Sequence, residues 1–309
     1  MPHRSRRITS YLWLLLNTIT WGAAFIVSKP ALDHTSPNLF MFYRLFLAGL
    51  IMLPFLVYWL KDTKLRRILP TILGVEFVGN VLCLAFLYEG LARSTAIETG
   101  LISTTAPIFI VLAGVLILRE KQTRREWFGL GVTFFGVLLI TLYPIMNGGA
   151  QLGALSLVGN GFIIASNILT GVYVVLAKKF YKGVNKLYAA SVSFVSGAAA
   201  FGVLSLWQAG SVTAVVQQIQ LDWSQPTVWY AVLYMGIVGS IIGLTSYIKG
   251  QDGIEASEAG LFYYLHPIIY IPMGVWLLKE PFTWIQALGL GFVLVGVLIA
   301  EQPFSKKRR

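Results

Sequence analysis

The chain has 309 residues, of which 56% are hydrophobic and 12% are charged. A soluble domain carries about 25% charged residues, so about half that share indicates a chain whose apolar surface faces lipid. The net charge of +11 would suggest nucleic acid as the partner of a soluble protein. In a membrane protein it instead reflects the enrichment of Lys and Arg in cytoplasmic loops. We therefore expect a lipid bilayer, and no nucleic acid, as a partner.

The first apolar stretch covers residues 11–27 and follows an Arg-rich start. This arrangement resembles a secretory signal peptide, but it has no A-x-A cleavage motif and further apolar stretches follow it. We interpret it as an uncleaved first transmembrane helix.

Ten stretches are long and apolar enough to cross a bilayer, which takes about 20 residues of α-helix. They predict an all-α membrane protein with ten transmembrane helices. The expected spans are 11–29, 37–60, 69–91, 96–118, 127–143, 153–177, 187–208, 228–250, 256–278 and 284–301. A short surface helix is also expected at 212–221, in the long connection between the seventh and eighth spans.

The second half of the chain repeats the first. After a shift of 160 residues, 96–140 align with 256–300 without a gap, about 17 of 45 pairs are identical, and Pro107 falls on Pro267. A unit with an odd number of spans, repeated in tandem, must insert its second copy upside down. The pattern therefore predicts two inverted five-helix repeats, a device of secondary transporters that share a site near the membrane midplane.

These patterns also predict the organisation and orientation of the chain. We expect an N-terminal segment at 1–10, the first repeat at 11–143, a linker at 144–152, the second repeat at 153–301 and a basic tail at 302–309. With this topology 20 of the 24 Lys and Arg residues lie on the side of both termini. Because cytoplasmic loops are enriched in Lys and Arg, both termini are predicted in the cytoplasm.

Some charged residues and the cysteine call for separate interpretation. Arg44, Glu120 and Glu280 lie near span ends, where we interpret them as interfacial anchors or as ion pairs that fix helix ends. The only cysteine, Cys83, lies in an apolar stretch and has no possible disulfide partner within the chain. The His and acidic residues lack the spacing of metal ligands, so we expect no metal and no cofactor.

Polar side chains at bilayer depth are costly and usually face a cavity or a partner group. Spans 1, 3, 4, 6 and 9 each carry such residues on one helical face, and span 8 adds a tyrosine. We expect these faces to line one cavity, with aromatic rings for an apolar part of the cargo and amides and hydroxyls for its polar groups. The predicted substrate-binding residues are Asn17, Trp21, Phe25, Asn80, Asn167, Thr170, Tyr247, Tyr263 and Tyr270.

Two ionisable residues lie near the centres of their spans, and both are candidates for proton coupling. A carboxyl group such as Glu76 could load and release protons there, or it could be neutral and hydrogen-bonded to a neighbouring helix. An imidazole such as His266 titrates near neutral pH, or it bonds a backbone carbonyl that Pro267 leaves free.

Proline and glycine in the spans predict hinges and close packing. Pro107 and Pro267 occupy matching positions, where each removes a backbone donor and produces either a hinge for alternating access or a static kink. Small residues let helices approach closely in lipid. We therefore expect the fifth and tenth spans to pack together, within one chain or across a homodimer interface, through the glycines at 129, 131, 136, 289, 291 and 296.

Several segments resemble EamA-type carriers of the drug/metabolite transporter superfamily. Thr20–Phe25 (TWGAAF) resembles the first helix of these carriers and Tyr43–Leu45 their second, while Ala92–Glu120 and Leu261–Glu280 resemble matching regions of their two halves. The resemblance implies transport of small metabolites, often amino acids, sugars or drugs, through a central cavity. Relatives with phosphorylated cargo tend to use central Lys or Arg; none is expected at midplane here, which disfavours phosphate or nucleotide cargo.

Together these patterns predict an inner-membrane secondary carrier, monomeric or homodimeric, that exports a small amphipathic metabolite such as an amino acid or a drug-like compound. Alternating access would be driven by protons or by the substrate gradient alone. A membrane-embedded enzyme would need a polar cluster such as Asp/His pairs at one leaflet, and a non-transporting scaffold often has a large additional domain. The sequence shows neither, so we expect no enzyme activity.

Overall fold

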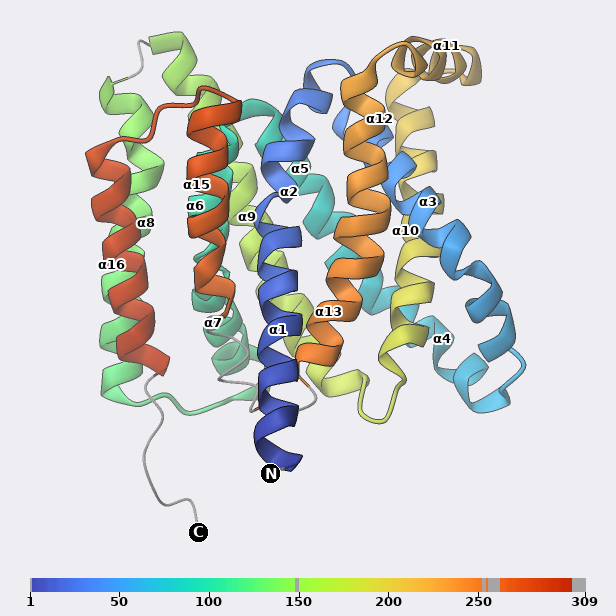
Figure 1. The fold of residues 1–309 in the computed structure, drawn as a ribbon, viewed down its shortest axis with the longest axis horizontal. Helices are drawn as coiled ribbons and strands as arrows, with labels where there is room; N and C mark the ends of the chain where they lie inside the picture. The colour runs from blue at the N-terminus through green and yellow to red at the C-terminus, as the bar shows by residue number, and fades with distance from the viewer. Residues whose placement is uncertain (1, 148–149, 252–253, 255–261, 302–309) are drawn as a thin grey trace.

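The computed structural model describes residues 2–147, 150–251, 254 and 262–301. Every regular element in these ranges is helical, and no strand is present in them. The long helices stand side by side, and α1 begins at the same end of the bundle at which α16 ends (Figure 1). The short helix α11 lies across the opposite end (Figure 1).

The chain forms the following elements, with η marking 3-10 and π-helical segments. They are α1 (Pro2–Gly22), α2 (Ala24–Ser28), η1 (Lys29–Asp33), α3 (Pro37–Trp59), α4 (Thr63–Glu76), η2 (Phe77–Leu82), α5 (Cys83–Arg93), α6 (Ala96–Ser103), α7 (Ala106–Leu118), α8 (Arg124–Asn147), α9 (Ala150–Phe180), α10 (Lys186–Ala209), α11 (Val212–Trp223), α12 (Pro226–Leu233), η3 (Tyr234–Ile242), α13 (Gly243–Gly250), η5 (Phe262–Leu265), α15 (His266–Leu277) and α16 (Trp284–Glu301).

Within the described residues, eight helical stretches are long and apolar enough to cross a membrane. They correspond to the first eight predicted spans, and they are Arg7–Asp33, Pro37–Trp59, Thr63–Arg93, Ala96–Leu118, Arg124–Tyr143, Ser156–Phe180, Lys186–Ala209 and Pro226–Gly250. The tenth predicted span is the shorter apolar helix Trp284–Ala300. The predicted ninth span begins in 255–261, outside the described residues, and continues through η5 and α15.

Helix ends follow local rules that differ in detail from the predicted boundaries. The first helix starts at Pro2, well before residue 11, because a proline in the first turn lacks only an N–H that would have no helical partner. Around the predicted linker 144–152, α8 continues to Asn147 and α9 starts at Ala150. The predicted surface helix is present as α11, and the Ser211 side chain caps it by accepting the Ala214 N–H at 3.1 Å.

Local backbone geometry recurs in the two halves at the spacing of the sequence repeat. Arg119 and Lys279 both have φ of 56°, and the residue after each donates its backbone N–H to a glycine carbonyl at 3.2 Å. The π-helical segments η2 and η3 also lie in corresponding spans. The helices α7 and α15 carry Pro107 and Pro267 in their first turns, and each follows a break in its span.

The predicted packing of the fifth and tenth spans is confirmed, because α8 and α16 lie against each other along their lengths (Figure 1). A Cβ added at Gly136 would lie 2.5 Å from the carbonyl oxygen of Gly289, and one at Gly129 would lie 2.5 Å from that of Gly296. These four glycines therefore permit a backbone-to-backbone approach. The other two differ, because a Cβ at residue 131 or 291 would meet nothing within 4 Å.

The helix α11 is fixed to the bundle through one buried acid. Asp222 is fully buried, and its carboxylate accepts the Tyr43 hydroxyl at 2.8 Å and the Gln218 side-chain amide at 2.8 Å. Val212 and Trp223 of the same helix are about two-thirds exposed. A helix that lies across the bundle end with apolar residues exposed is suited to the boundary between lipid and water.

A central cavity as the candidate substrate site

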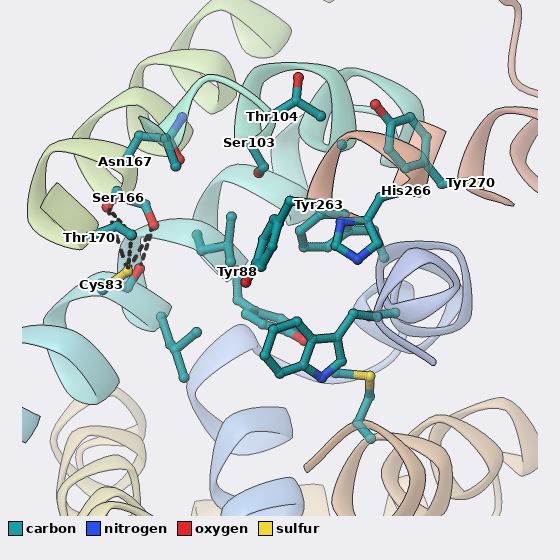
Figure 2. A pocket seen from close by; sticks show the side chains of 18 of the residues that line it. Cys83, Tyr88, Ser103, Thr104, Ser166, Asn167, Thr170, Tyr263, His266 and Tyr270 are labelled. Carbon is teal, nitrogen blue, oxygen red and sulfur yellow. Dashed lines mark hydrogen bonds between the residues drawn. The ribbon is translucent and has the colours of Figure 1, made fainter. Parts of the chain in front are cut away.

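A cavity of about 300 Å³ lies among the helices, and both halves of the chain line it (Figure 2). Its walls come from α1, α2, α3, α5, α6, α7, α9, η3, η5 and α15. The lining residues are Trp21, Ala24, Phe25, Arg44, Cys83, Leu84, Leu87, Tyr88, Gly100, Ser103, Thr104, Ala106, Ser166, Asn167, Thr170, Met235, Tyr263, His266 and Tyr270. The lower limit of typical ligand sites is also about 300 Å³, so the cavity suits a small molecule.

Aromatic rings form one part of the wall. The rings of Trp21 and Tyr263 meet edge to face with centroids 5.9 Å apart, and Tyr263 meets the His266 ring at 4.8 Å. The Trp21 indole N–H donates to the carbonyl of Gly239 at 2.9 Å, which fixes the ring against η3. A rigid aromatic wall of this kind binds an apolar or aromatic group with little loss of side-chain entropy.

Small polar side chains of α5 and α9 form another part of the wall, on the side opposite His266 and Tyr270 (Figure 2). The Cys83 thiol lies 3.2 Å from the Ser166 hydroxyl and 3.0 Å from the Thr170 hydroxyl. Asn167 donates its amide to the carbonyl of Ile102 at 2.8 Å. These bonds join α9 to α5 through Cys83 and to α6 through Ile102.

Three polar atoms in the cavity wall have no hydrogen-bond partner among the described residues. They are the Ser103 hydroxyl, Nε2 of His266 and the Tyr270 hydroxyl. The His266 ring also bonds the backbone of Tyr263, so its other nitrogen is already engaged. Buried polar groups are normally satisfied, so these three atoms of lining residues are candidates for hydrogen bonds to a guest molecule or water.

The structure places Arg44 in the cavity wall, which corrects its interpretation as an interfacial anchor. Its Nη1 donates to the Tyr88 hydroxyl at 3.0 Å and its Nε to the Ser240 hydroxyl at 3.3 Å. No carboxylate pairs with it in the described part of the chain. The correction has a simple reason: Arg44 is the eighth residue of α3 and lies about two helical turns inside the span.

Three predicted substrate-binding residues lie outside the cavity lining. Asn17 and Asn80 are buried and donate to backbone carbonyls, of Gly243 at 3.0 Å and of Ser193 at 2.7 Å. The Tyr247 ring packs behind Trp21 with centroids 5.4 Å apart. The other six predicted residues line the cavity: Trp21, Phe25, Asn167, Thr170, Tyr263 and Tyr270.

The two candidates for proton coupling occupy different surroundings. His266 lines the cavity. Glu76 does not; it is 3% exposed, and its Oε1 accepts the hydroxyls of Tyr173 at 3.2 Å and Tyr181 at 2.7 Å. The Glu76 carboxyl is thus joined to α9 and to the residue that follows α9.

The two prolines occupy the second position of their helices. Pro107 follows the end of α6 and a short break, and Pro267 follows the 3-10 segment η5. A proline in the first helical turn leaves no backbone acceptor unpaired, so neither proline kinks a continuous helix. Each follows directly on a cavity-lining residue, Ala106 or His266, at a break in regular α-helix.

Charged residues near the span ends bind helix termini and one another. Glu280 accepts the backbone N–H groups of Ala96 and Ile97, both at 2.8 Å, and so caps α6 across the two halves. Burial raises the pKa of Glu280, while these two N–H donors act in the opposite direction. Glu120, its counterpart in the sequence repeat, pairs with Lys178 at 2.7 Å in a more exposed position.

Sequence reasoning missed Arg44, Tyr88 and Ser166 of this lining. A signal for Arg44 was present: the residues one turn away on its own helix, at 40, 41, 47 and 48, are all apolar. An arginine inside a span without a nearby acid has to find its partners on another helix or in a cavity.

Comparisons with known proteins agree with this architecture. The model of the EamA-like transporter family matches residues 8–142 and again 157–301. Similar proteins include the "Uncharacterized transporter YyaM" of Bacillus subtilis, 26% identical over 96% of this chain and 94% of its own. They also include the "Uncharacterized inner membrane transporter YedA" of Escherichia coli K12, 23% identical over 91% of this chain and 87% of its own.

A solved crystal structure has the same fold with a TM-score of 0.63 and 18% identity, and the match covers 96% of this chain and 95% of that one. The family model covers most of the chain in two copies. The chain is therefore a multi-pass membrane protein that belongs to the EamA-like transporter family.

Proposed function

We propose that this protein is a secondary transporter that exports a small amphipathic metabolite across the inner membrane by alternating access. The observation that carries the proposal is the central cavity, which both halves of the chain line with aromatic rings and with unpartnered polar atoms. The names of the similar proteins support a transport function, and that of YedA supports the inner membrane.

Two inverted five-helix repeats would supply the alternating access. Support comes from the two separate matches of the family model and from backbone features that recur at the spacing of the sequence repeat. The breaks before Pro107 and Pro267 are the candidate hinges, since both lie beside the cavity where the chain leaves regular α-helix.

We infer cytoplasmic termini from the distribution of Lys and Arg, of which 20 of 24 fall on one side in this topology. The start of α1 and the end of α16 at one end of the bundle support the same orientation (Figure 1). Reporter fusions after Arg309 and near Glu126 should therefore read cytoplasmic, and one near Gly149 should read outside. An outside signal after Arg309 would contradict the inverted arrangement.

The energy source is proposed to be the proton gradient, with Glu76 or His266 as the titrating group. The alternative is an uncoupled facilitator of the same cargo. Glu76 has two phenol partners and lies outside the cavity, whereas His266 faces the cavity directly.

The test of transport begins with a screen of metabolites for thermal stabilisation of the purified protein. The compounds that stabilise it are then measured by counterflow in liposomes. Ala106→Trp would fill the cavity, and it should abolish counterflow. Leu116→Trp is the matched control, since Leu116 lies on the same helix and is 79% exposed. Equal counterflow by both variants would exclude the cavity as the transport path.

A further inference from the structure

Arg44 brings a positive charge to the cavity that the described residues do not neutralise. Its guanidinium group carries five N–H donors, and two of them donate, to neutral hydroxyls of Tyr88 and Ser240. No described acid forms an ion pair with it. Asp222 binds Tyr43, the residue before Arg44, and both of its carboxylate oxygens already accept hydrogen bonds, from Tyr43 and Gln218.

The surroundings of Arg44 hold the guanidinium in place. Tyr88 is 1% exposed, and its hydroxyl also lies 3.5 Å from the Ser28 hydroxyl. The Ser240 hydroxyl donates to the carbonyl of Met235 at 2.8 Å, so its lone pairs are oriented to accept from Arg44. Residues of α2, α5 and η3 thus position the guanidinium group of Arg44. Three of its five N–H groups keep no partner among the described residues.

A charged group at this depth is costly unless it is paired or hydrated. The planar fork of a guanidinium matches the geometry of a carboxylate, to which it can donate two parallel hydrogen bonds. Among the described residues that line the cavity, Arg44 is also the only Lys or Arg. A single positive charge balances a monoanion, and a doubly charged phosphate ester would leave one negative charge uncompensated.

The other lining residues indicate the chemistry of the rest of the bound molecule. Trp21, Phe25 and Tyr263 offer an apolar and aromatic surface. The Tyr270 hydroxyl, on a side chain only 2% exposed, and Nε2 of His266 offer unpartnered hydrogen-bonding groups. The volume of about 300 Å³ limits the guest to roughly the size of an aromatic amino acid.

We propose that the cargo is a small organic carboxylate with an apolar or aromatic body, and that Arg44 binds the carboxylate group. This inference rests on the proposed transport function and names the substrate class of the same cavity. It also revises the expectation from sequence that no central cation is available.

The test compares matched pairs of probes that differ only in charge. Phenylacetate and 3-phenylpropanoate are the acids, their primary amides are the neutral partners, and phenyl phosphate is the phosphate arm. Thermal stabilisation of the full-length purified protein and binding by calorimetry are the readouts. The acids should stabilise the protein, and the amides and phenyl phosphate should bind at least tenfold more weakly.

Arginine variants then assign the effect. Arg44→Gln should weaken binding of the acids at least tenfold and leave binding of the amides unchanged, and Arg44→Lys should retain part of the preference for acids. Arg93→Gln is the matched control, because Arg93 pairs with Glu89 outside the cavity and its loss should not alter the preference. If Arg44→Gln does not yield folded protein, the ratio of acid to amide affinity in Arg44→Lys decides whether Arg44 binds the carboxylate.

The outcomes separate the two proposals. Equal binding of acids and amides by the parent protein would overturn the role of Arg44, and so would an unchanged preference for acids in the folded Arg44 variants. In either case, counterflow of neutral compounds would leave the proposed transport function intact. Tighter binding of phenyl phosphate would replace the carboxylate by a phosphate. If neither acids nor amides bind or exchange in liposomes, both this inference and the transport of this cargo class fail.

Discussion

The close contact between α8 and α16 leads to a quantitative prediction for Gly136→Ala. The new Cβ would lie 2.5 Å from the Gly289 oxygen and 2.9 Å from Cβ of Phe292. Ordinary contact begins at 3.4 Å, so the two backbones must separate by about 0.9 Å, and overpacking of this kind costs about 1–3 kcal/mol.

The same substitution also has a stabilising effect. Alanine has less conformational freedom than glycine in the unfolded chain, and this favours the helix by up to about 1 kcal/mol. Gly131→Ala isolates that gain, because a Cβ at Gly131 meets nothing within 4 Å on the same helix. We therefore expect the free energy of unfolding of Gly136→Ala to lie about 1–3 kcal/mol below that of Gly131→Ala. The same contrast is expected on α16. Gly289→Ala should lose stability through overpacking, and Gly291→Ala should not, because a Cβ at Gly291 meets nothing within 4 Å.

Reversible unfolding of purified protein in mixed micelles, followed by circular dichroism, measures the difference. Comparing two alanine variants on one helix cancels most effects of the micelle and of the unfolded state. If all four variants have the same stability, α8 and α16 do not pack through their glycine backbones, and the reasoning from Cβ positions is refuted.

Three further predictions follow from the site. Glu76→Gln should abolish proton-driven accumulation and preserve substrate counterflow, both measured on one reconstituted preparation; full accumulation by the variant would make Glu76 structural. Pro107→Ala or Pro267→Ala should slow exchange in counterflow more than it weakens binding, and unchanged rates in both variants would leave the breaks static. Glu280→Gln should lower the free energy of unfolding by about 1 kcal/mol, because the charged cap of α6 is lost. Glu120→Gln should change it by less than about 0.5 kcal/mol, since that ion pair is exposed.

The spans could be predicted from the sequence because the thickness of the bilayer fixes their length and apolar character. The contact of the fifth and tenth spans was also predictable, since its glycines recur at helical spacing. What the sequence did not show is that α1 begins at Pro2 or that α8 and α9 nearly meet, because the hydropathy pattern marks the depth of the membrane and not the end of a helix.

The candidate site was only partly predictable, and η2 shows why. An ideal α-helix would put Glu76, Asn80 and Cys83 on one face. Residues 77–82 are instead π-helical and contain more residues in each turn. The face therefore rotates, and of these three residues only Cys83 reaches the cavity. Propensity and periodicity do not report a change of helix type.

Arg44 illustrates a second limit. Its position inside a span was visible, but its surroundings are built by Tyr88 and Ser240, which are 44 and 196 residues away in the chain. One sequence without a structure cannot place those hydroxyls beside it.

Several side-chain contacts between helices end on a backbone carbonyl and not on a second side chain. Asn80 donates to the carbonyl of Ser193, and Asn17 donates to that of Gly243. Every amino acid supplies the same backbone carbonyl, so a mutation at the acceptor position does not remove the hydrogen bond. Such a mutation therefore creates no selection for a compensating change at the asparagine. Covariation between aligned sequences should therefore miss these contacts. A lineage can also exchange many side chains around such bonds while its helices keep their positions.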